Sequence, residues 1–167
     1  MSKSLYDCEE DKLMFKLYNI NSEIFKKYEK VSTEDILNEL KQVKNPNYQD
    51  KKGYSYLHIA CMMHCVEAIK ILLNMGADPN ITDKRGGQPV LGAIGSKNEN
   101  NIKIFELMFQ HGLNIDLPMR DKTLKEVIES FGNNEYNEII KKYYKKWDNY
   151  LEEQLEKVAL FICKNLK

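Results

Sequence analysis

The sequence has no long apolar segment. Its 167 residues include no run that approaches the roughly 20 apolar residues of a membrane-spanning helix. The first residues, MSKSLYDCEEDK, are too charged for a secretory signal peptide. Cysteine is scarce as well: the four residues are scattered, which is typical of reduced thiols rather than of a disulfide framework. These absences predict a cytoplasmic protein without a membrane partner.

An excess of charge of one sign is also missing. Lys and Arg total 25, and Asp and Glu total 25, so no overall field attracts nucleic acid or an anionic membrane. One local patch near the C-terminus combines lysines with aromatic residues: Lys141, Lys142, Lys145, Lys146, Tyr143, Tyr144 and Trp147. Such a patch can bind single-stranded nucleic acid, but aromatic residues that face inward and lysines that face water explain the same pattern. We predict no nucleic-acid partner.

Motifs of catalysis are absent too. The sequence contains no nucleophile elbow, His-Glu-x-x-His pair or phosphate-binding loop. Its one cluster of metal-ligating residue types, HIACMMHC at 58–65, lies on one predicted helix, whereas a zinc site needs four converging ligands. We predict a protein that is not an enzyme, with no catalytic residue, cofactor or metal. An enzyme or zinc protein built around His58, Cys61 and His64 is the alternative, which elemental analysis would test.

The most informative pattern is a 33-residue segment at positions 50–82, DKKGYSYLHIACMMHCVEAIKILLNMGADPNIT. Gly53 stands where a β-turn needs a residue tolerant of positive φ. Ser55 is placed to cap a helix, and His58 to form a hydrogen bond back to the turn. A second helix follows with a buried apolar stripe, formed by Ile69, Leu72 and Leu73, and Gly76 ends it.

This segment resembles an ankyrin repeat. Its length matches the period of that repeat, and Ser55, Leu57, His58 and Ala60 match the T-P-L-H-x-A start of the first helix. Tyr56 replaces the proline of the pattern. The resemblance implies a helical solenoid whose usual function is to bind other proteins rather than to catalyse a reaction.

Less regular copies flank this repeat. A second begins at Asp83 and has a three-residue insertion in the turn between its helices, at Ser96–Asn101. A degenerate third copy starts its first helix at Thr123, and the segment from Val31 to Asp50 resembles the second half of a further repeat. Two short amphipathic segments within residues 4–29 predict a helical N-terminal cap, with apolar residues Leu13, Phe15, Leu17, Ile24 and Phe25.

The C-terminal segment departs from the repeat pattern. Apolar residues at helical spacing, namely Ile140, Tyr144, Trp147, Leu151, Leu155, Val158 and Ile162, predict one long helix from about Glu135, either continuous or broken near Asp148. This helix could cap the stack, form a dimer or bind a partner. We favour the cap, and we expect a monomer when the protein is free.

The predicted fold is therefore all-α: a short ankyrin-repeat solenoid of about three imperfect repeats plus a half-repeat, with a helical N-terminal cap and a C-terminal capping helix. We expect a single domain over 1–167. The cap and half-repeat would occupy 1–47, the repeats 48–134 and the C-terminal helix 135–167.

The resemblance also indicates where a partner protein would bind. In ankyrin proteins the turns, or fingers, and the exposed side of each first helix form the binding surface. The equivalent residues here, with the inter-helix insertion, are Lys51, Lys52, Tyr54, Met62, Met63, Lys84, Arg85, Asn98 and Asn101. Tyrosine and arginine are favoured anchors at interfaces, and methionine adapts to irregular pockets. The alternative for Met62 and Met63 is packing against the neighbouring repeat.

Two specific functions fit such a protein. The first is a small immunity protein that binds and neutralises a cognate toxin, which the short repeat stack without a catalytic domain resembles in architecture. The second is a viral or pathogen protein that engages a host regulatory protein. The identity of the neighbouring gene would discriminate between them.

Overall fold

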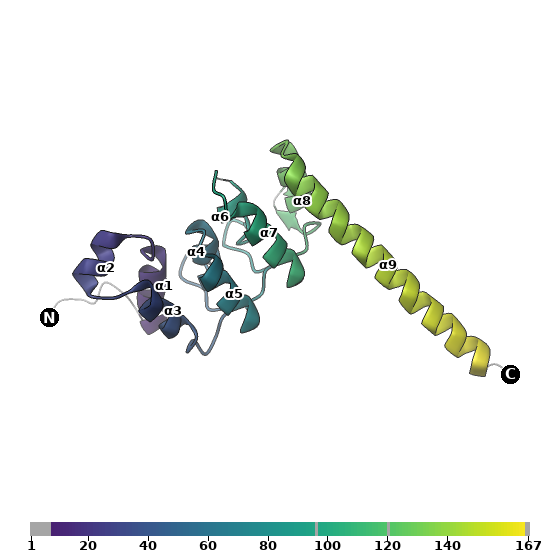
Figure 1. Cartoon of the computed structure of the whole chain (residues 1–167), viewed down its shortest axis with the longest axis horizontal. Helices are drawn as coiled ribbons and strands as arrows, with labels where there is room; N and C mark the ends of the chain where they lie inside the picture. The colour runs from purple at the N-terminus through teal and green to yellow at the C-terminus, as the bar shows by residue number, and fades with distance from the viewer. Residues whose placement is uncertain (1–7, 96, 120, 166–167) are drawn as a thin grey trace. The chain divides into compact units, whose positions relative to one another are not determined.

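The computed structural model describes residues 8–95, 97–119 and 121–165 (Figure 1). The first four predicted cap residues, 4–7, lie outside this range, and so do the side chains of Trp147 and Ile162 in the predicted C-terminal stripe. The regular elements of the described residues are helices, apart from one short hairpin. The elements are α1 (Glu9–Tyr18), α2 (Glu23–Glu29), α3 (Thr33–Leu40), α4 (Tyr56–Met62), α5 (Val66–Asn74), α6 (Leu91–Ile94), α7 (Asn101–Gln110), β1 (Pro118–Met119), β2 (Lys122–Thr123), α8 (Leu124–Ser130) and α9 (Asn134–Asn165).

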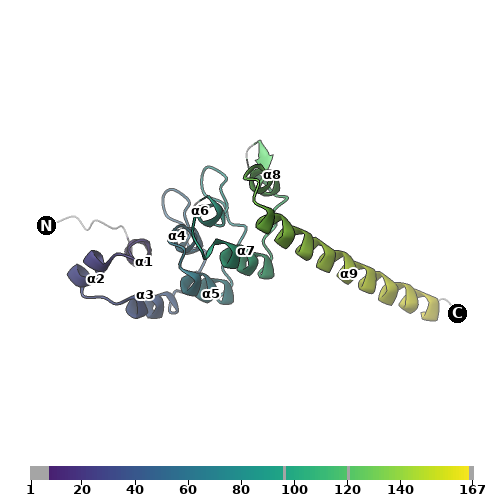
Figure 2. The same ribbon diagram turned by 45° about the horizontal axis from the view of Figure 1, so that its top comes forward.

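Two compact units divide the chain, one over residues 1–127 and one over residues 128–167. In the first unit the helices pack in two rows. Helices α1, α4 and α6 contact one another in sequence and form one row, and α3, α5 and α7 form the other. Helix pairs α4–α5 and α6–α7 join the rows (Figure 2). This stacking of helical hairpins confirms the predicted solenoid.

Local signals in the sequence start the helices as expected. At α4 the Ser55 hydroxyl accepts a hydrogen bond from the His58 amide, while the His58 ring accepts one from the Ser55 amide, forming a capping box. Ser32 and Asp35 form the same arrangement at α3. Thr123, predicted to start the first helix of the third copy, exchanges hydrogen bonds with Glu126 in the same way. These bonds satisfy amides that the first helical turn leaves without partners.

The core lies between the two rows of helices. Leu72 and Ile69 of α5 are 0% exposed and Leu73 is 4% exposed, which confirms the predicted apolar stripe. Asn47 and Asn80 occupy equivalent positions and connect successive repeats. Asn47 donates to the Gly76 carbonyl and accepts from the Asp78 amide. Asn80 does the same with Gly112 and Asn114.

The N-terminal segment contains the two predicted short helices, α1 and α2. Helix α1 packs on α4 and α3, and Leu13 and Leu17 are buried. Not every predicted apolar residue is interior. The Phe15 ring meets Phe25 edge to face at 5.5 Å, but Ile24 of α2 is 85% exposed. Helical spacing therefore predicted both helices, but not which apolar side chains the rest of the unit covers.

The segment between α6 and α7 is described at residues 95 and 97–100, and it corresponds to most of the predicted insertion. Asn98 is exposed there. Asn101 is different: it is the first residue of α7 and only 5% exposed. The prediction that placed Asn101 in an exposed loop that binds a partner is therefore wrong, because the helix begins one residue earlier than the insertion pattern suggested.

The second unit contains the end of α8 and the long helix α9. Helix α9 runs from Asn134 to Asn165 without interruption, so of the two alternatives the continuous helix is correct and there is no break near Asp148. Neither Gly nor Pro lies within this segment, and such residues are the usual cause of a break. Its C-terminal half exposes Leu151, Leu155 and Val158. Among the described residues no helix combines the length and apolar character needed to cross a membrane.

Candidate protein-binding surface

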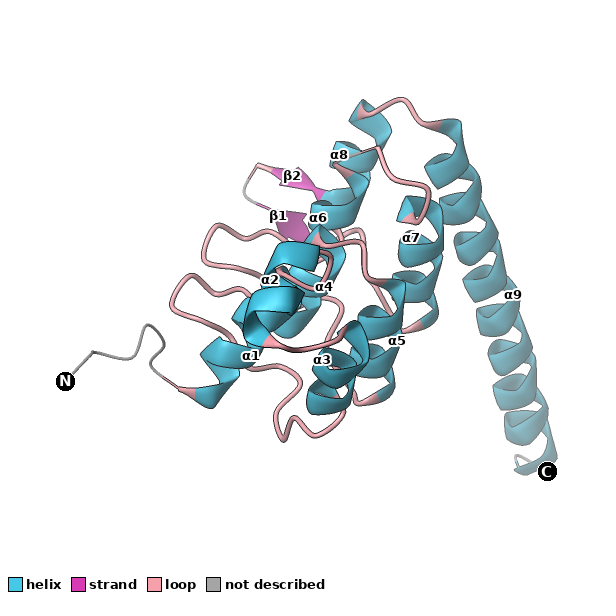
Figure 3. Cartoon of the chain, turned by 60° about the vertical axis from the view of Figure 1, so that its left-hand side comes forward, coloured by secondary structure: helices cyan, strands magenta, loops and turns pink. Residues whose placement is uncertain are grey.

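Two tight turns of identical construction project from the first unit beside the β1–β2 hairpin (Figure 3). We name residues 50–54 the first finger and residues 83–87 the second finger. In the first, the Asp50 carboxylate accepts hydrogen bonds from the Lys52 and Tyr54 amides at 2.8 and 2.9 Å. In the second, Asp83 accepts from the Arg85 and Gly87 amides at the same two distances. Each finger is thus closed by its own aspartate.

The fingers are also bonded to each other. The Lys84 amide donates to the Lys52 carbonyl at 3.1 Å. Gly53 permits this approach in two ways. Its φ is +84°, and a Cβ added to it would lie 2.7 Å from the Lys84 nitrogen. Glycine is therefore needed both for the left-handed turn and for the close contact between neighbouring turns.

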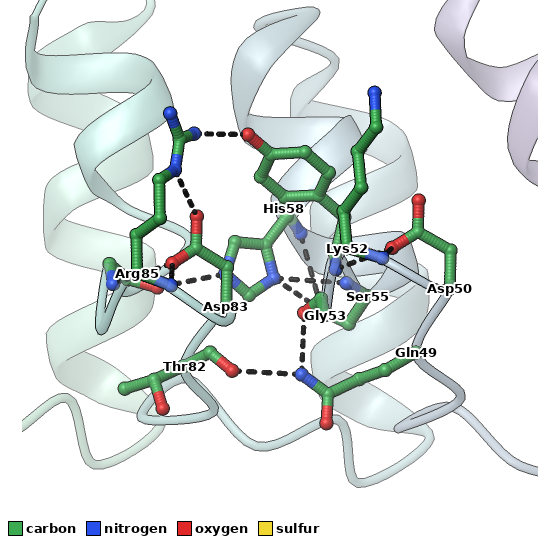
Figure 4. Close-up of polar contacts among 11 residues, drawn as sticks. Gln49, Asp50, Lys52, Gly53, Ser55, His58, Thr82, Asp83 and Arg85 are labelled. Carbon is green, nitrogen blue, oxygen red and sulfur yellow. Dashed lines mark hydrogen bonds and ion pairs between the residues drawn. The ribbon is translucent and has the colours of Figure 1, made fainter.

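Side chains bridge the same two fingers. The Arg85 guanidinium donates through Nη2 to the Tyr54 hydroxyl and lies 5.9 Å from the centre of the Tyr54 ring. Its Nε is 3.5 Å from the Asp83 carboxylate (Figure 4). Partial burial raises the pKa of Asp83, but hydrogen bonds from the Gly87 and Arg85 amides, together with the charges of Arg85 and His58, hold that pKa below its usual value. Two predicted partner-binding residues, Tyr54 and Arg85, therefore form one feature.

His58 connects α4 to the second finger by a hydrogen bond, and its ring meets the Tyr54 ring of the first finger edge to face at 5.6 Å. Its Nδ1 accepts from the Ser55 amide at 3.0 Å, and its Nε2 lies 3.0 Å from the Gly87 carbonyl (Figure 4). An accepting Nδ1 and a donating Nε2 require the neutral ring, with the proton on Nε2. Burial lowers the pKa of His58, and it outweighs the Gly87 hydrogen bond and the charges of Asp83 and Asp50, which raise it. The predicted structural role of His58 is confirmed and extended to the next repeat.

This arrangement predicts how stability depends on pH. The folded-state pKa of His58 lies below the unfolded value of 6.5, so the unfolded chain binds a proton more readily. The full contribution of neutral His58 is present above pH 6.5 and is lost as the pH falls from 6.5 towards the folded-state pKa. We expect the free energy of unfolding, measured in urea between pH 7.5 and 5.5, to decrease on acidification.

The control is His58→Ala, which should lose about 1 kcal/mol of stability at neutral pH through a missing hydrogen bond. Its stability should depend less on pH over the same interval than that of the unmodified protein. His64 and His111 are present in both proteins, so the difference between the two curves reports on His58. Equal slopes would contradict the assignment.

A cavity of about 420 Å³ opens beside the Tyr54–Arg85 bridge. Its apolar wall consists of Tyr54, Met62, Pro89, Leu91 and Met119. The cavity exists because two equivalent positions of successive repeats differ. Gly87 stands 33 positions after Tyr54, one repeat later, and has no side chain to fill the space. Gly92 follows Ile59 by the same interval, but Met62 packs there: a Cβ on Gly92 would lie 2.7 Å from Met62 Cγ.

A second cavity, of about 660 Å³, adjoins the first finger on the other side of Tyr54 and Met62. Both residues line both cavities. Helix α1 contributes Asp11, Met14, Phe15 and Tyr18 to the second cavity, and the first finger contributes Asp50, Lys51 and Lys52. A partly apolar surface therefore extends from α1 to the β1–β2 hairpin.

Most of the predicted partner-binding residues lie at this surface. Lys51, Lys52, Lys84 and Arg85 are exposed on the fingers, and Tyr54 and Met62 are half-buried beside them. Met63 lines neither cavity; it follows α4, and its carbonyl accepts from the Asn21 side chain at 2.8 Å. Asn98 lies in the α6–α7 turn, and Asn101 is buried. The finger residues thus come together, whereas the insertion residues do not join them.

Sequence reasoning missed part of this surface. The sequence predicts Phe15 only as part of the N-terminal cap, and it gives no sign that Tyr18, Leu91 and Met119 lie at a surface. One signal was available: glycine at position 87, where the preceding copy has Tyr54. The apolar residues of α1 and of the hairpin gave no comparable signal, because their proximity to the fingers depends on how the repeats stack.

The thiols of Cys61 and Cys65 offer little chemical reactivity. Burial raises the pKa of the Cys61 thiol well above its usual value, and burial also raises that of Cys65. A raised pKa keeps sulfur protonated and weakly nucleophilic at neutral pH. No group of three or more His, Cys, Asp or Glu residues in the described part of the chain is arranged to hold a metal ion.

Comparison with known proteins agrees with this geometry. A family model described as ankyrin repeats (3 copies) matches residues 28–119, more than half of the chain. The chain belongs to the ankyrin-repeat family. An ankyrin repeat domain from Acinetobacter baumannii has a similar structure, with a TM-score of 0.65, 18% identity, and coverage of 82% of this chain and 66% of that one. At this identity the likeness concerns the fold.

Three curated proteins are similar over the repeats. A putative ankyrin repeat protein (L92) of Acanthamoeba polyphaga mimivirus is 32% identical over 78 residues, 47% of this chain and 18% of that protein. A mouse B-cell lymphoma 3 protein homolog is 34% identical over 74 residues, 44% and 15% of the two chains. An Arabidopsis thaliana serine/threonine-protein kinase (12) is 34% identical over 84 residues, 50% and 18%. This ankyrin-repeat chain spans less than a fifth of each.

Proposed function

We propose that this ankyrin-repeat protein acts by binding another protein through its finger face, which we define as Lys51, Lys52, Tyr54, Met62, Lys84 and Arg85. Ankyrin repeats generally mediate protein–protein interactions. The observation that carries the proposal is the hydrogen-bonded pair of fingers, closed by Asp50 and Asp83 and bonded to each other, beside two partly apolar cavities. Such a surface is ordered before binding, which reduces the entropy lost on association.

The charge of the finger face indicates an acidic partner. Four basic side chains are exposed on the two fingers and outnumber the two carboxylates there, Asp50 and Asp83. Both carboxylates accept hydrogen bonds from amides of their own turns, and Asp83 also pairs with Arg85. Basic residues around an apolar patch favour a partner that presents carboxylates around a hydrophobic feature. Met63 and Asn98 lie outside the finger face. A catalytic role is not part of the proposal, since the fold is typically a binding module.

For the specific role we propose a cytoplasmic immunity protein that binds and neutralises a cognate toxin. The support is the finger face, which presents exposed basic side chains beside two partly apolar cavities. The alternative is a viral or pathogen protein that engages a host regulatory protein, and the similarity to a mimivirus ankyrin protein supports it. The two roles differ in the identity of the partner and share the same surface.

The test is affinity purification of the tagged protein from the organism that encodes it, with captured proteins identified by mass spectrometry. A variant with Lys52→Glu and Tyr54→Ala serves as the matched control, because both positions are on the finger face. We expect a partner that the unmodified protein retains and the control loses. Capture of a toxin supports immunity, and capture of a host regulator supports the alternative. If every captured protein binds both forms equally, the proposed surface is wrong.

A further inference from the structure

The cavity beside Gly87 makes the chemistry of the partner more specific. We propose that it receives one aromatic side chain of the partner, from a segment whose neighbouring residues are acidic and pair with the basic side chains of the fingers. This inference rests on the proposed function, because it specifies what the finger face recognises. It would be wrong, with the proposed function intact, if a partner bound the fingers without entering the cavity.

The size and lining of the cavity favour an aromatic ring. A volume of about 420 Å³ lies within the range of roughly 300–1,000 Å³ that is typical of ligand pockets. Four of its apolar lining residues, Tyr54, Met62, Leu91 and Met119, are only half-buried, so a partner group would cover apolar surface that water now contacts. Two of the four are methionines, whose sulfur atoms contact aromatic rings favourably and whose flexible chains adapt to them.

The rim of the cavity favours acidic neighbours. Arg85 lines the cavity. Its side chain is 68% exposed although it pairs with Asp83. The guanidinium has its donors in a fixed fork that matches a carboxylate. Lys52 and Lys84 are exposed on the same two fingers. A carboxylate next to the inserted ring would therefore meet positive charge on the side of the cavity that the fingers form.

The cavity depends on the absence of a side chain at Gly87, and this allows a direct test. Unlike Gly53 and Gly86, Gly87 does not have a positive φ. A Cβ at position 87 would lie 3.4 Å from Asp83 Oδ1 and 3.5 Å from Leu91 Cδ1, which are ordinary contact distances. Gly87→Leu is therefore compatible with the backbone and places its side chain beside Leu91, in the cavity itself.

The experiment is an NMR titration of protein labelled with ¹³C at its methionine methyl groups. The probe is a synthetic peptide, acetyl-Ser-Glu-Asp-Phe-Asp-Glu-Ser-amide. Two matched peptides replace either the phenylalanine by alanine or the four acidic residues by lysine. We expect the first peptide to shift the Met62 and Met119 methyl resonances and to leave Met75, which lies at the end of α5, unchanged. Each matched peptide should bind at least about tenfold more weakly.

Two variants complete the test. Gly87→Leu should weaken binding of the phenylalanine peptide about tenfold or more, whereas Lys103→Leu, which adds the same side chain at an exposed position of α7, should not. If Gly87→Leu does not fold by circular dichroism, Met119→Gln replaces it. That change alters a half-buried wall of the cavity and should also weaken binding several-fold.

Several outcomes would overturn the inference. One is that the phenylalanine and alanine peptides bind equally well. Another is that the methyl resonances do not shift at millimolar peptide, and a third is that Gly87→Leu leaves the shifts unchanged. Methyl shifts that depend on protein concentration without peptide would identify a second copy of the chain as the occupant instead. In the affinity purification, a partner lost by Tyr54→Ala but retained by Gly87→Leu would reject the cavity and leave the proposed function standing.

Discussion

Replacing Leu72 by alanine is expected to destabilise the protein by about 2–5 kcal/mol, because it leaves a cavity in a close-packed core. Leu72 is 0% exposed and lies on α5, which packs on α3, α4 and α7. The loss therefore affects contacts with several neighbouring helices at once. Urea unfolding followed by circular dichroism at 222 nm measures the effect.

The matched control is Leu155→Ala on α9, where the leucine is 69% exposed. Substitutions at exposed positions usually change stability by no more than about 0.5 kcal/mol. A loss at Leu72 no larger than that at Leu155 would contradict the position of α5 at the centre of the solenoid. The comparison also separates burial from helix propensity, because both changes replace leucine by alanine within a helix.

The second large effect concerns the partner. Once a partner has been captured, Tyr54→Ala is expected to weaken its binding by about 2 kcal/mol or more, mainly through faster dissociation. Tyr54 lines both cavities and holds Arg85 through its hydroxyl, so its removal alters contacts on both sides. Surface plasmon resonance with the immobilised partner separates the two rate constants. Tyr54→Phe is the control, because it keeps the ring and removes only the hydroxyl.

The charges of the first finger should affect the association rate constant. Changing Lys51 and Lys52 to Glu is expected to slow association, most clearly at low salt, since exposed charges steer a partner before contact.

The alternative to the finger face as the binding surface is the C-terminal helix. Full binding by the Tyr54 variant, together with no binding by a folded chain that ends at Lys146, would show that this helix carries the interface.

Much of the fold could be predicted because its signals are local. The cap formed by Ser55 and His58, the positive φ at Gly53 and the apolar stripe of α5 each involve residues a few positions apart. Such signals can therefore be recognised in the sequence without knowledge of the tertiary structure. The sequence left a helix boundary or a helix length undecided where a local pattern was compatible with two structures. Insertion spacing did not establish where α7 begins, and helical spacing did not reveal that α9 continues past Asp148.

The candidate site was predicted as a set of finger residues but not as a shape. The sequence by itself determined that Lys51, Lys52, Tyr54, Lys84 and Arg85 belong to two equivalent turns, because turn and helix signals recur at a fixed interval. Only the tertiary structure decided that Arg85 reaches Tyr54, that Gly87 leaves a cavity, and that Met119 lines it. These features depend on the distance between neighbouring repeats and on the directions of their side chains. The stacking of the repeats sets this distance and these directions. That stacking depends on many residues that are far apart in the chain.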